Sequence, residues 1–455
     1  MTRMFYNRPM RVLFVCVVAA GCYHPSPPAG APCATDDNCP VEQTCSGGYC
    51  LPPGTGPTDD ACGPATCRGN DLVGCGAPIS CPVGCSDVGT VHCFALVPSN
   101  ALTPDLLVGA TMDVDGTRRW SFDSETGEIR QGNTFLRHEG EGLDNGIGFT
   151  VVDGVGVFTA HSFTVLAGLD WQMNGSRPVA LYAATTIEVS ATIDAGGALG
   201  TAGPGGSAGT TSTTPSSSAC EGRAGRLLGA TAGEGGGGGG GATAGGNGGP
   251  SSASNPTGLG GAMCASPSTI PLRGGHGGGA GTVSIANSGG GGGGAIALVA
   301  MQEITINDGG AVATPGGGGL SSATGNGGGG GGSGGAVLIE APIVAIHGAV
   351  TANGGSGAAP TIVSGVRGST TTATPAPGGV YSGPGGTRRG GNGGAGMAAA
   401  GNGETYAYDD GLGTVTVRGA GGGGAVGRVE IRARSLDTTG MTESPSAALH
   451  DVVLQ

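Results

Sequence analysis

The sequence predicts an all-β chain, in which a parallel β-solenoid carries long glycine-rich insertions and is preceded by small disulfide-rich modules. Three observations predict this fold class. Segments of alternating apolar and polar residues recur from about residue 157 to residue 445. Glycine supplies 103 of the 455 residues and gathers between those segments. Most of the 14 cysteines precede residue 94.

Residues 1–21 have the layout of a secretory signal peptide: three arginines, the apolar run 12–20, and small residues. The run is too short to span a bilayer, which takes about 20 residues. The stretch "VVAAGC" resembles the lipobox of bacterial lipoproteins, with Ala19 where that family prefers leucine. The resemblance implies that Cys22 is lipidated and anchors the chain. Tyr23 replaces the aspartate that marks inner-membrane retention in the family, which implies the outer membrane and the cell surface. An ordinary cleavable signal that leaves Cys22 unlipidated is the alternative.

Two cysteine-rich modules follow a proline-rich tether at 22–32. The four-cysteine module 33–50 and the six-cysteine module 62–98 are separated by a linker at 51–61. The stretch "CATDDNCPVEQTCSGGYC" resembles the cysteine-rich repeats of bacterial surface lipoproteins, which are similar to the N-terminal Dickkopf-type motif. The cysteines of the first module are Cys33, Cys39, Cys45 and Cys50, and those of the second are Cys62, Cys67, Cys75, Cys81, Cys85 and Cys93.

We expect these cysteines, and the later pair Cys220 and Cys264, to form disulfides, because export implies an oxidising compartment and each group is even. Four cysteines allow three pairings and six allow fifteen, so the connectivity stays open. Zinc is the competing interpretation, but neither module contains a C-x-x-C pair, and His92 is the only histidine within the two modules. We therefore expect no metal and no cofactor.

The solenoid is expected at 157–445, where five segments align as coils. In each, an alternating strand ends at an alanine, a second strand begins three or four residues later, and in the first four a third strand follows. The alanines are Ala160, Ala183, Ala300, Ala341 and Ala433; the second strands begin at Phe163, Ile187, Ile304, Val344 and Leu436; the third lie at Leu169, Ile193, Val312 and Val350.

Alternation directs every second side chain inward, and β-branched residues pack well on a pleated face. The expected inward rows are Ile187, Val189 and Ile193, then Ile304, Ile306 and Val312, then Val344, Ile346 and Val350. One coil cannot bury its apolar row alone, so several must stack.

Long glycine-rich insertions interrupt the coils at about 198–290, 317–335 and 356–424. Two states stay open for them: flexible loops, or extended polyproline-type strands that approach closely because side chains are missing. A Cys220–Cys264 bridge would hold the first insertion. The fragments "GTVSIAN" at 281 and "GTVTVRG" at 413 are candidates for further coil strands.

Residues 99–156 are expected to form a β-rich cap with a hairpin turn near Thr126–Gly127, since a solenoid needs an end that hides its edge. Residues 446–455 are expected to form a C-terminal tail. The coil pattern resembles the right-handed parallel β-helix, pectin-lyase-like superfamily of bacterial surface proteins.

That resemblance brings in polysaccharide lyases and hydrolases, but the sequence pairs no carboxylates for such chemistry. Asp194, Asp308 and Glu340 fall on different strands, and Asp409–Asp410 lie in a loop. His276 sits in a glycine run, and His161 and His347 lie at bends. The chain has no lysine, which excludes a Walker-type phosphate loop, and its net charge of −13 disfavours nucleic acid.

The expected function is therefore that of a non-catalytic structural or adhesive lipoprotein of the cell surface. Its partners would be the membrane, through the lipid, and polysaccharide or another surface protein. Two alternatives stay open: a carbohydrate-active β-helix enzyme, and a protein-binding cysteine module on a passive stalk.

Overall fold

The computed structural model describes residues 43–46, 49–51, 65–74, 77–81, 83–211, 216–227, 233–250, 258–264, 268–281, 288–321, 327–383, 386–409 and 415–455. The chain divides into two compact units, Met1–Cys93 and Phe94–Gln455. The signal segment, Cys22, the tether, Cys33, Cys39, Cys62 and Cys75 lie outside the described residues.

The described part of the first unit consists of short antiparallel strands cross-linked by disulfides. Disulfides join Cys67 to Cys85 and Cys81 to Cys93. Strands this short bury little apolar surface, so covalent cross-links supply much of what holds them together. The strands are β1 (Thr44–Ser46), β2 (Tyr49–Leu51), β3 (Thr66–Arg68), β4 (Asp71–Val73), β5 (Ile79–Ser80), β6 (Cys85–Ser86) and β7 (His92–Cys93). Cys45 and Cys50 are opposite each other in the β1–β2 pair.

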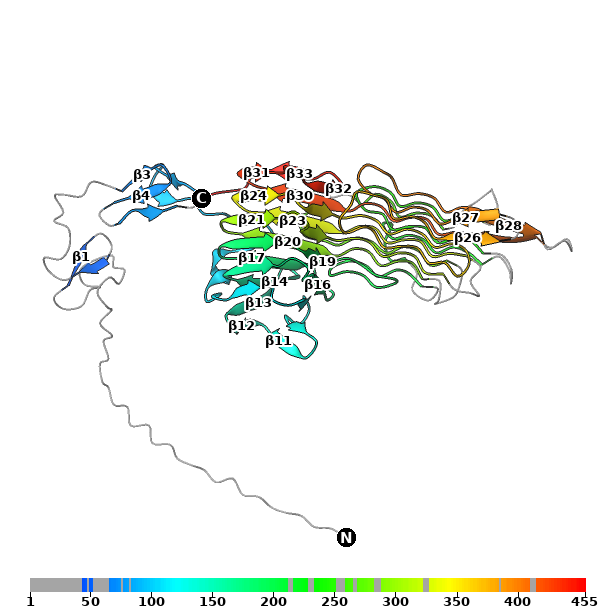
Figure 1. Cartoon of the computed structure of the whole chain (residues 1–455), viewed down its shortest axis with the longest axis horizontal. Coiled ribbons are helices and arrows are strands. Elements are labelled where there is room, and N and C mark those ends of the chain that lie inside the picture. Colours follow the sequence, from blue (N-terminus) through cyan, green and yellow to red (C-terminus); the bar gives the residue numbers. More distant parts are fainter. Residues whose placement is uncertain are drawn as a thin grey trace, which may run out of the picture. The chain divides into compact units, whose positions relative to one another are not determined.

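The second unit contains the predicted parallel β-solenoid, in which the chain visits three sheets in turn (Figure 1). The first sheet contains, in spatial order, β12 (Gly142–Asp144), β13 (Ile147–Val152), β14 (Val155–Ala160), β17 (Val179–Ala183), β20 (Ala295–Ala300), β23 (Ala336–Glu340), β30 (Arg428–Arg432) and β33 (Ala448–His450). The second contains β8 (Asp113–Asp115), β15 (Ser162–Val165), β18 (Thr186–Val189), β21 (Glu303–Ile306), β24 (Ile343–Ile346) and β31 (Ser435–Asp437). The third contains β11 (Thr134–Arg137), β10 (Ile129–Gln131), β9 (Ser121–Asp123), β16 (Trp171–Asn174), β19 (Thr192–Asp194), β22 (Ala311–Ala313), β25 (Ala349–Thr351) and β32 (Thr442–Ser444).

The predicted inward rows form the core. Ile187 pairs in register with Ile304, and Ile304 with Val344, so one β-branched side chain lies above the next. In the third sheet Val312 lies between Ile193 and Val350 in the same way. All nine predicted inward side chains are at most 1% exposed. At roughly 1.5–3 kcal/mol for each such buried side chain, this continuous column supplies the main stabilisation of the coils.

One predicted strand position was wrong. The third strand of the first coil does not include Leu169, because Leu169 closes a turn in which its N–H donates to the carbonyl of Leu166 at 3.1 Å. The strand starts two residues later, at Trp171, which lies in register with Ile193. The larger indole fills the end of the core, and it contacts Phe122 with ring centroids 5.0 Å apart.

The region 99–156 both begins the solenoid and covers its end. β8 and β9 already pair in parallel with β15 and β16. β10–β11 and β12–β13 then pair antiparallel, and the predicted turn is present at Gly127. A single 3-10 turn, η2 (Pro104–Leu107), precedes β8. Residues 94–98 belong to this second unit, where Ala95 exchanges backbone hydrogen bonds with Gln455 at the end of the chain.

The described parts of the glycine-rich insertions are mostly extended and lie side by side as a bundle next to the coils (Figure 1). The segment 328–335 shows how they pack. Its N–H groups donate in a three-residue cycle, with Gly328, Gly331 and Gly334 donating to the carbonyls of 419, 422 and 425. The intervening positions donate to two other segments, at 314–320 and at 276–279. A polyproline-II helix has three residues per turn and no internal hydrogen bonds, so its N–H groups point in three directions. The segment 328–335 is therefore in the extended polyproline-type state.

The same segment also accepts hydrogen bonds from three further segments. The donors are Gly236 and Gly239, Gly290 and Gly293, and Gly355 and Ala358. With three neighbours as acceptors and three as donors, the segment 328–335 is surrounded on six sides by other chain segments. This packing satisfies the buried backbone groups without any sheet.

The close spacing of this bundle requires glycine at successive positions. A Cβ on Gly329 would lie 2.2 Å from the carbonyl oxygen of Ser288. On Gly330 it would lie 2.1 Å from the carbonyl oxygen of Gly237, and on Gly331 the same distance from that of Gly355. Each of these three consecutive residues meets a different neighbour, so none of the three positions has room for a side chain.

The described residues of the last insertion include two antiparallel hairpins. They are β26 (Val380–Gly383) with β27 (Gly386–Arg389) and β28 (Thr405–Asp409) with β29 (Val415–Gly419). The fragment at 413, a candidate for a further coil strand, is therefore a hairpin strand, because β29 pairs antiparallel with β28. Most of the fragment at 281 lies outside the described residues.

Candidate functional site

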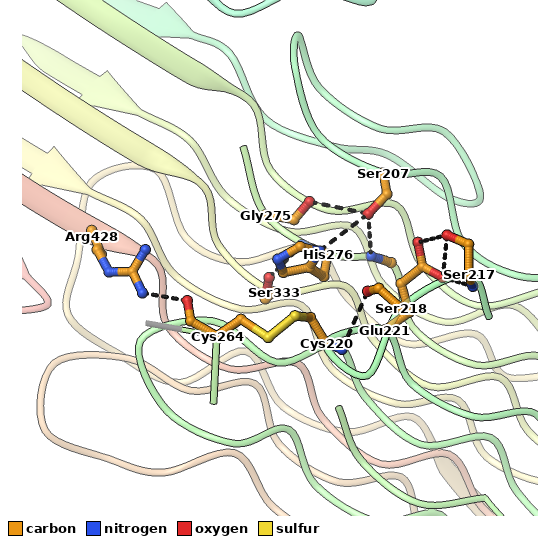
Figure 2. Close-up of a disulfide and its surroundings, with 11 residues drawn as sticks. Ser207, Ser217, Ser218, Cys220, Glu221, Cys264, Gly275, His276, Ser333 and Arg428 are labelled. Carbon is orange, nitrogen blue, oxygen red and sulfur yellow. Dashed lines mark hydrogen bonds between the residues drawn. A yellow bond between two sulfur atoms is a disulfide. The ribbon is translucent and has the colours of Figure 1, made fainter. Parts of the chain in front are cut away.

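The candidate site is a cavity of about 410 Å³ between the coils and the glycine bundle, lined by cysteine, histidine and arginine side chains. Cys220 and Cys264 line it and form a disulfide, which Figure 2 shows with His276 beside it. Ala336 begins β23 and Arg428 begins β30, so the cavity adjoins the first sheet. The lining residues are Cys220, Cys264, Ser268, Thr269, Pro271, Arg273, Gly274, His276, Ala336 and Arg428.

The disulfide Cys220–Cys264 closes a segment of 44 residues, with its Cα atoms 5.6 Å apart. Both cysteines are also fixed through their backbones to the central segment 234–241. Gly240 donates to the carbonyl of Cys220 at 2.8 Å, and Cys264 donates to the carbonyl of Gly241 at 3.0 Å. The bridge expected from the sequence therefore joins two segments that the glycine packing already places together.

His276 comes from the segment 274–281 and is half-buried beside the disulfide. Its backbone N–H donates to Ser333 Oγ at 2.8 Å, and its Nδ1 lies 3.5 Å from Ser207 Oγ. Burial lowers the pKa of His276 below its usual 6.5; Glu221 acts against this shift and Arg428 adds to it. The imidazole is therefore neutral at pH 7 and able to act as a ligand.

Two arginines give the cavity a positive lining. Arg428 donates to the carbonyl of Cys264, and burial lowers its pKa. Arg273 is exposed at the rim. None of the described lining residues is acidic.

The serine and histidine here do not form a nucleophile and base. Their separation of 3.5 Å exceeds a good hydrogen bond, and Glu221 accepts from Ser217 at 2.5 Å without a hydrogen bond to the imidazole among the described contacts. Instead, the sulfur atoms of Cys220 and Cys264 and a ring nitrogen of His276 lie within 4.8 Å of one another.

The carboxylates considered for sugar chemistry lie apart. Asp194 is paired with Arg367 and its side chain is 8% exposed. Asp308 is exposed in a turn after β21, and the side chains of Asp409 and Asp410 lie outside the description. Of the other histidines, His161 pairs with Asp113 at 2.7 Å, and His347 Nδ1 lies 2.9 Å from the Thr439 carbonyl oxygen.

A pair of carboxylates that sequence reasoning missed lies on the outer face of the first sheet. Glu340 and Glu430 are on adjacent strands, two positions apart in register, and both are 1% exposed. Glu340 accepts from the N–H and the hydroxyl of Ser99, each at 2.9 Å. Glu430 accepts from the N–H of Thr269 at 2.7 Å and from Arg432 Nε at 2.8 Å. The carboxylates therefore bind segments that cover the sheet. A glutamate on the same face of each strand, two positions apart in "AVLIE" and "RVEIR", was the available signal.

The buried carboxyl group of Glu340 predicts that the free energy of unfolding depends on pH. Burial raises the pKa of Glu340 above its usual 4.5, although hydrogen bonds from Ser99 oppose the shift. When the pKa of a group is raised in the folded state, its contribution to stability is fully present below the pKa of the unfolded chain. That contribution is lost as the pH rises through the pKa of the folded chain. We expect the free energy of unfolding of the native chain, minus that of Glu340→Gln, to fall above about pH 4.5, by about 1.4 kcal/mol for each unit of raised pKa.

Urea unfolding from pH 4 to 8 measures this difference through tryptophan fluorescence, since Trp120 and Trp171 are both buried in the solenoid. Asp308→Asn, at an exposed carboxylate, is the control. Parallel profiles for the native chain and the Glu340→Gln variant would contradict the expectation.

The fold and the cavity define the second unit as a parallel β-solenoid joined to a polyproline-II-type glycine bundle with a disulfide at the junction. Comparisons with protein-family models, curated proteins and solved structures found no match. Among the described residues, no helix has the length and apolar character needed to cross a bilayer.

Proposed function

We propose that this chain is a lipoprotein of the outer membrane that displays a rigid, non-catalytic scaffold at the cell surface and adheres there to polysaccharide or to another cell surface. The lipobox-like stretch before Cys22 supports the anchor. The short disulfide-linked strands of the first unit support the role of a protease-resistant spacer.

One observation carries the proposal: the second unit joins two stiff scaffolds with satisfied backbones. The coils share one continuous core, and the glycine segments are tied together by backbone hydrogen bonds in three directions. Such a unit presents broad, sparsely charged faces that suit many shallow contacts. The carboxylates of Glu340 and Glu430, which lie on adjacent strands, are buried and hydrogen-bonded to the segments that cover the sheet.

The test has two arms. In cells fed an azide-bearing fatty acid, the native chain should carry the label and fractionate with outer membrane, whereas Cys22→Ser should carry none. A native chain that stays unlabelled would overturn the anchor.

The second arm measures attachment of beads coated with the purified chain to polysaccharide surfaces. Attachment should survive deletion of residues 33–93 when the solenoid still unfolds cooperatively. Loss of attachment on that deletion would favour the cysteine modules as the binder. Release of reducing or unsaturated sugar ends would favour the carbohydrate-active enzyme.

A further inference from the structure

We propose that Cys220, Cys264 and His276 form a redox-gated zinc site: a disulfide when oxidised, and a two-thiolate, one-imidazole site for a single Zn²⁺ when reduced. Among the described residues, this is the group of cysteine, histidine and carboxylate side chains close enough together to share one ion. The inference is independent of the adhesive role.

The distances suit the change. Zinc takes thiolate sulfur at about 2.3 Å and imidazole nitrogen at about 2.0–2.1 Å, which places tetrahedral ligands roughly 3.5–3.8 Å apart. The two sulfurs and the ring nitrogen are within 4.8 Å of one another, and the cysteine Cα atoms are 5.6 Å apart. Small side-chain rotations after cleavage of the sulfur–sulfur bond therefore reach the required geometry.

The backbone keeps the ligands together once the disulfide is open. Cys220 and Cys264 are each hydrogen-bonded to the segment 234–241, through Gly240 and Gly241. His276 is fixed by the bond from its N–H to Ser333 Oγ. The polypeptide thus holds all three positions without the covalent bridge.

The imidazole is oriented for this role. Ser207 Oγ lies 3.5 Å from Nδ1, where it can accept only a long hydrogen bond; Nδ1 thus faces the serine, and we assign Nε2 to the metal (Figure 2). Metal-binding histidines are commonly fixed in this way by a group at the other nitrogen. Two thiolates cancel the charge of the ion, so Arg428 beside Cys264 faces a neutral centre.

The reaction balances as follows. A dithiol protein, or a phosphine in the laboratory, supplies two electrons, and with two protons the sulfur–sulfur bond becomes two thiols. Zn²⁺ then displaces both thiol protons and binds the thiolates and the neutral imidazole. The cavity of about 410 Å³ leaves room for water as the fourth ligand, so the site is open on one side.

The experiment uses the full chain, reduced with a phosphine and freed of excess reductant. Samples with one equivalent of ZnCl₂, or with chelator, are alkylated with iodoacetamide, and each cysteine is read by mass spectrometry. We expect zinc to slow alkylation of Cys220 and Cys264 at least tenfold. Co²⁺ should give thiolate charge-transfer absorption that Cys220→Ser removes.

The variants separate ligand from scaffold. In His276→Gln, the protection from alkylation that zinc gives the two cysteines should fall about tenfold. His276→Cys should restore this protection by supplying a third thiolate. His347→Gln, at a histidine bound to the Thr439 carbonyl, should behave as native. The proposal is overturned when zinc gives no protection at these two cysteines, or when His276→Gln protects as well as the native chain. Fast hydrogen exchange across 234–241 in the reduced chain would overturn it as well, since the ligands would no longer be held together.

Discussion

Gly330→Ala is expected to destabilise the glycine bundle by about 3 kcal/mol, because an added methyl in a close-packed interior forces the backbone to move. Its Cβ would lie 2.1 Å from the carbonyl oxygen of Gly237. Gly330 also donates to the Gly279 carbonyl and accepts from the N–H of Gly290, so any shift lengthens hydrogen bonds on two further sides.

Hydrogen exchange of peptides spanning 328–335 measures this effect. Exchange should speed up roughly a hundredfold in the variant, since each 1.4 kcal/mol of opening free energy is tenfold. Ala208→Ser adds one atom at an exposed position of the same bundle and should leave the exchange unchanged. Slow exchange preserved in Gly330→Ala would show that the segments are not packed at this spacing.

Arg137→Met is expected to lower the free energy of unfolding by about 4 kcal/mol, because it removes a buried charge that satisfies many backbone groups at once. Arg137 is 1% exposed at the end of β11. Its guanidinium donates to the carbonyls of Gly127, Ile147, His138, Gly140 and Gly142, at 2.6–3.3 Å. It also lies 5.4 Å from the ring centroid of Phe149. This one side chain therefore holds together the turns that close the first end of the solenoid.

Urea unfolding followed by tryptophan fluorescence gives the measurement. Arg137→Lys should recover only part of the loss, since an ammonium has three donors and lacks the planar fork. Arg130→Met is the matched control, because Arg130 lies on β10 with its side chain 53% exposed and pairs with Glu128. Exposed pairs are worth about 0–1 kcal/mol, so equal losses at the two arginines would contradict the role of Arg137.

The core of the coils could be predicted from local pattern. A period of two with isoleucine and valine inward identified Ile187, Ile304 and Val344, and the structure stacks them in register. Leu169 was misplaced because a turn and a strand both tolerate leucine, and the choice of Trp171 depends on aromatic packing with Phe122. Arg137 gave no signal, since a lone arginine in a hairpin is ordinarily solvated.

The candidate site could be predicted only in part. The pairing of Cys220 with Cys264 followed from cysteine counting, and the structure has it. His276 beside that bridge did not follow, because the segments 216–227, 258–264 and 268–281 meet through backbone hydrogen bonds that no side chain encodes. Glu340 and Glu430 became a pair only when β23 met β30 across an insertion.

The stacking of coils on rows of isoleucine and valine follows from local sequence, because side-chain alternation is a local property of a strand. Whether the glycine runs are packed against one another depends on the tertiary structure. A run of identical residues without side chains specifies neither register nor partner, so whether it is loose or packed depends on which distant segments accept its hydrogen bonds. Here segments as far apart in the sequence as 236–239, 328–335 and 419–427 are joined by backbone hydrogen bonds. The close approach of these segments in turn requires glycine.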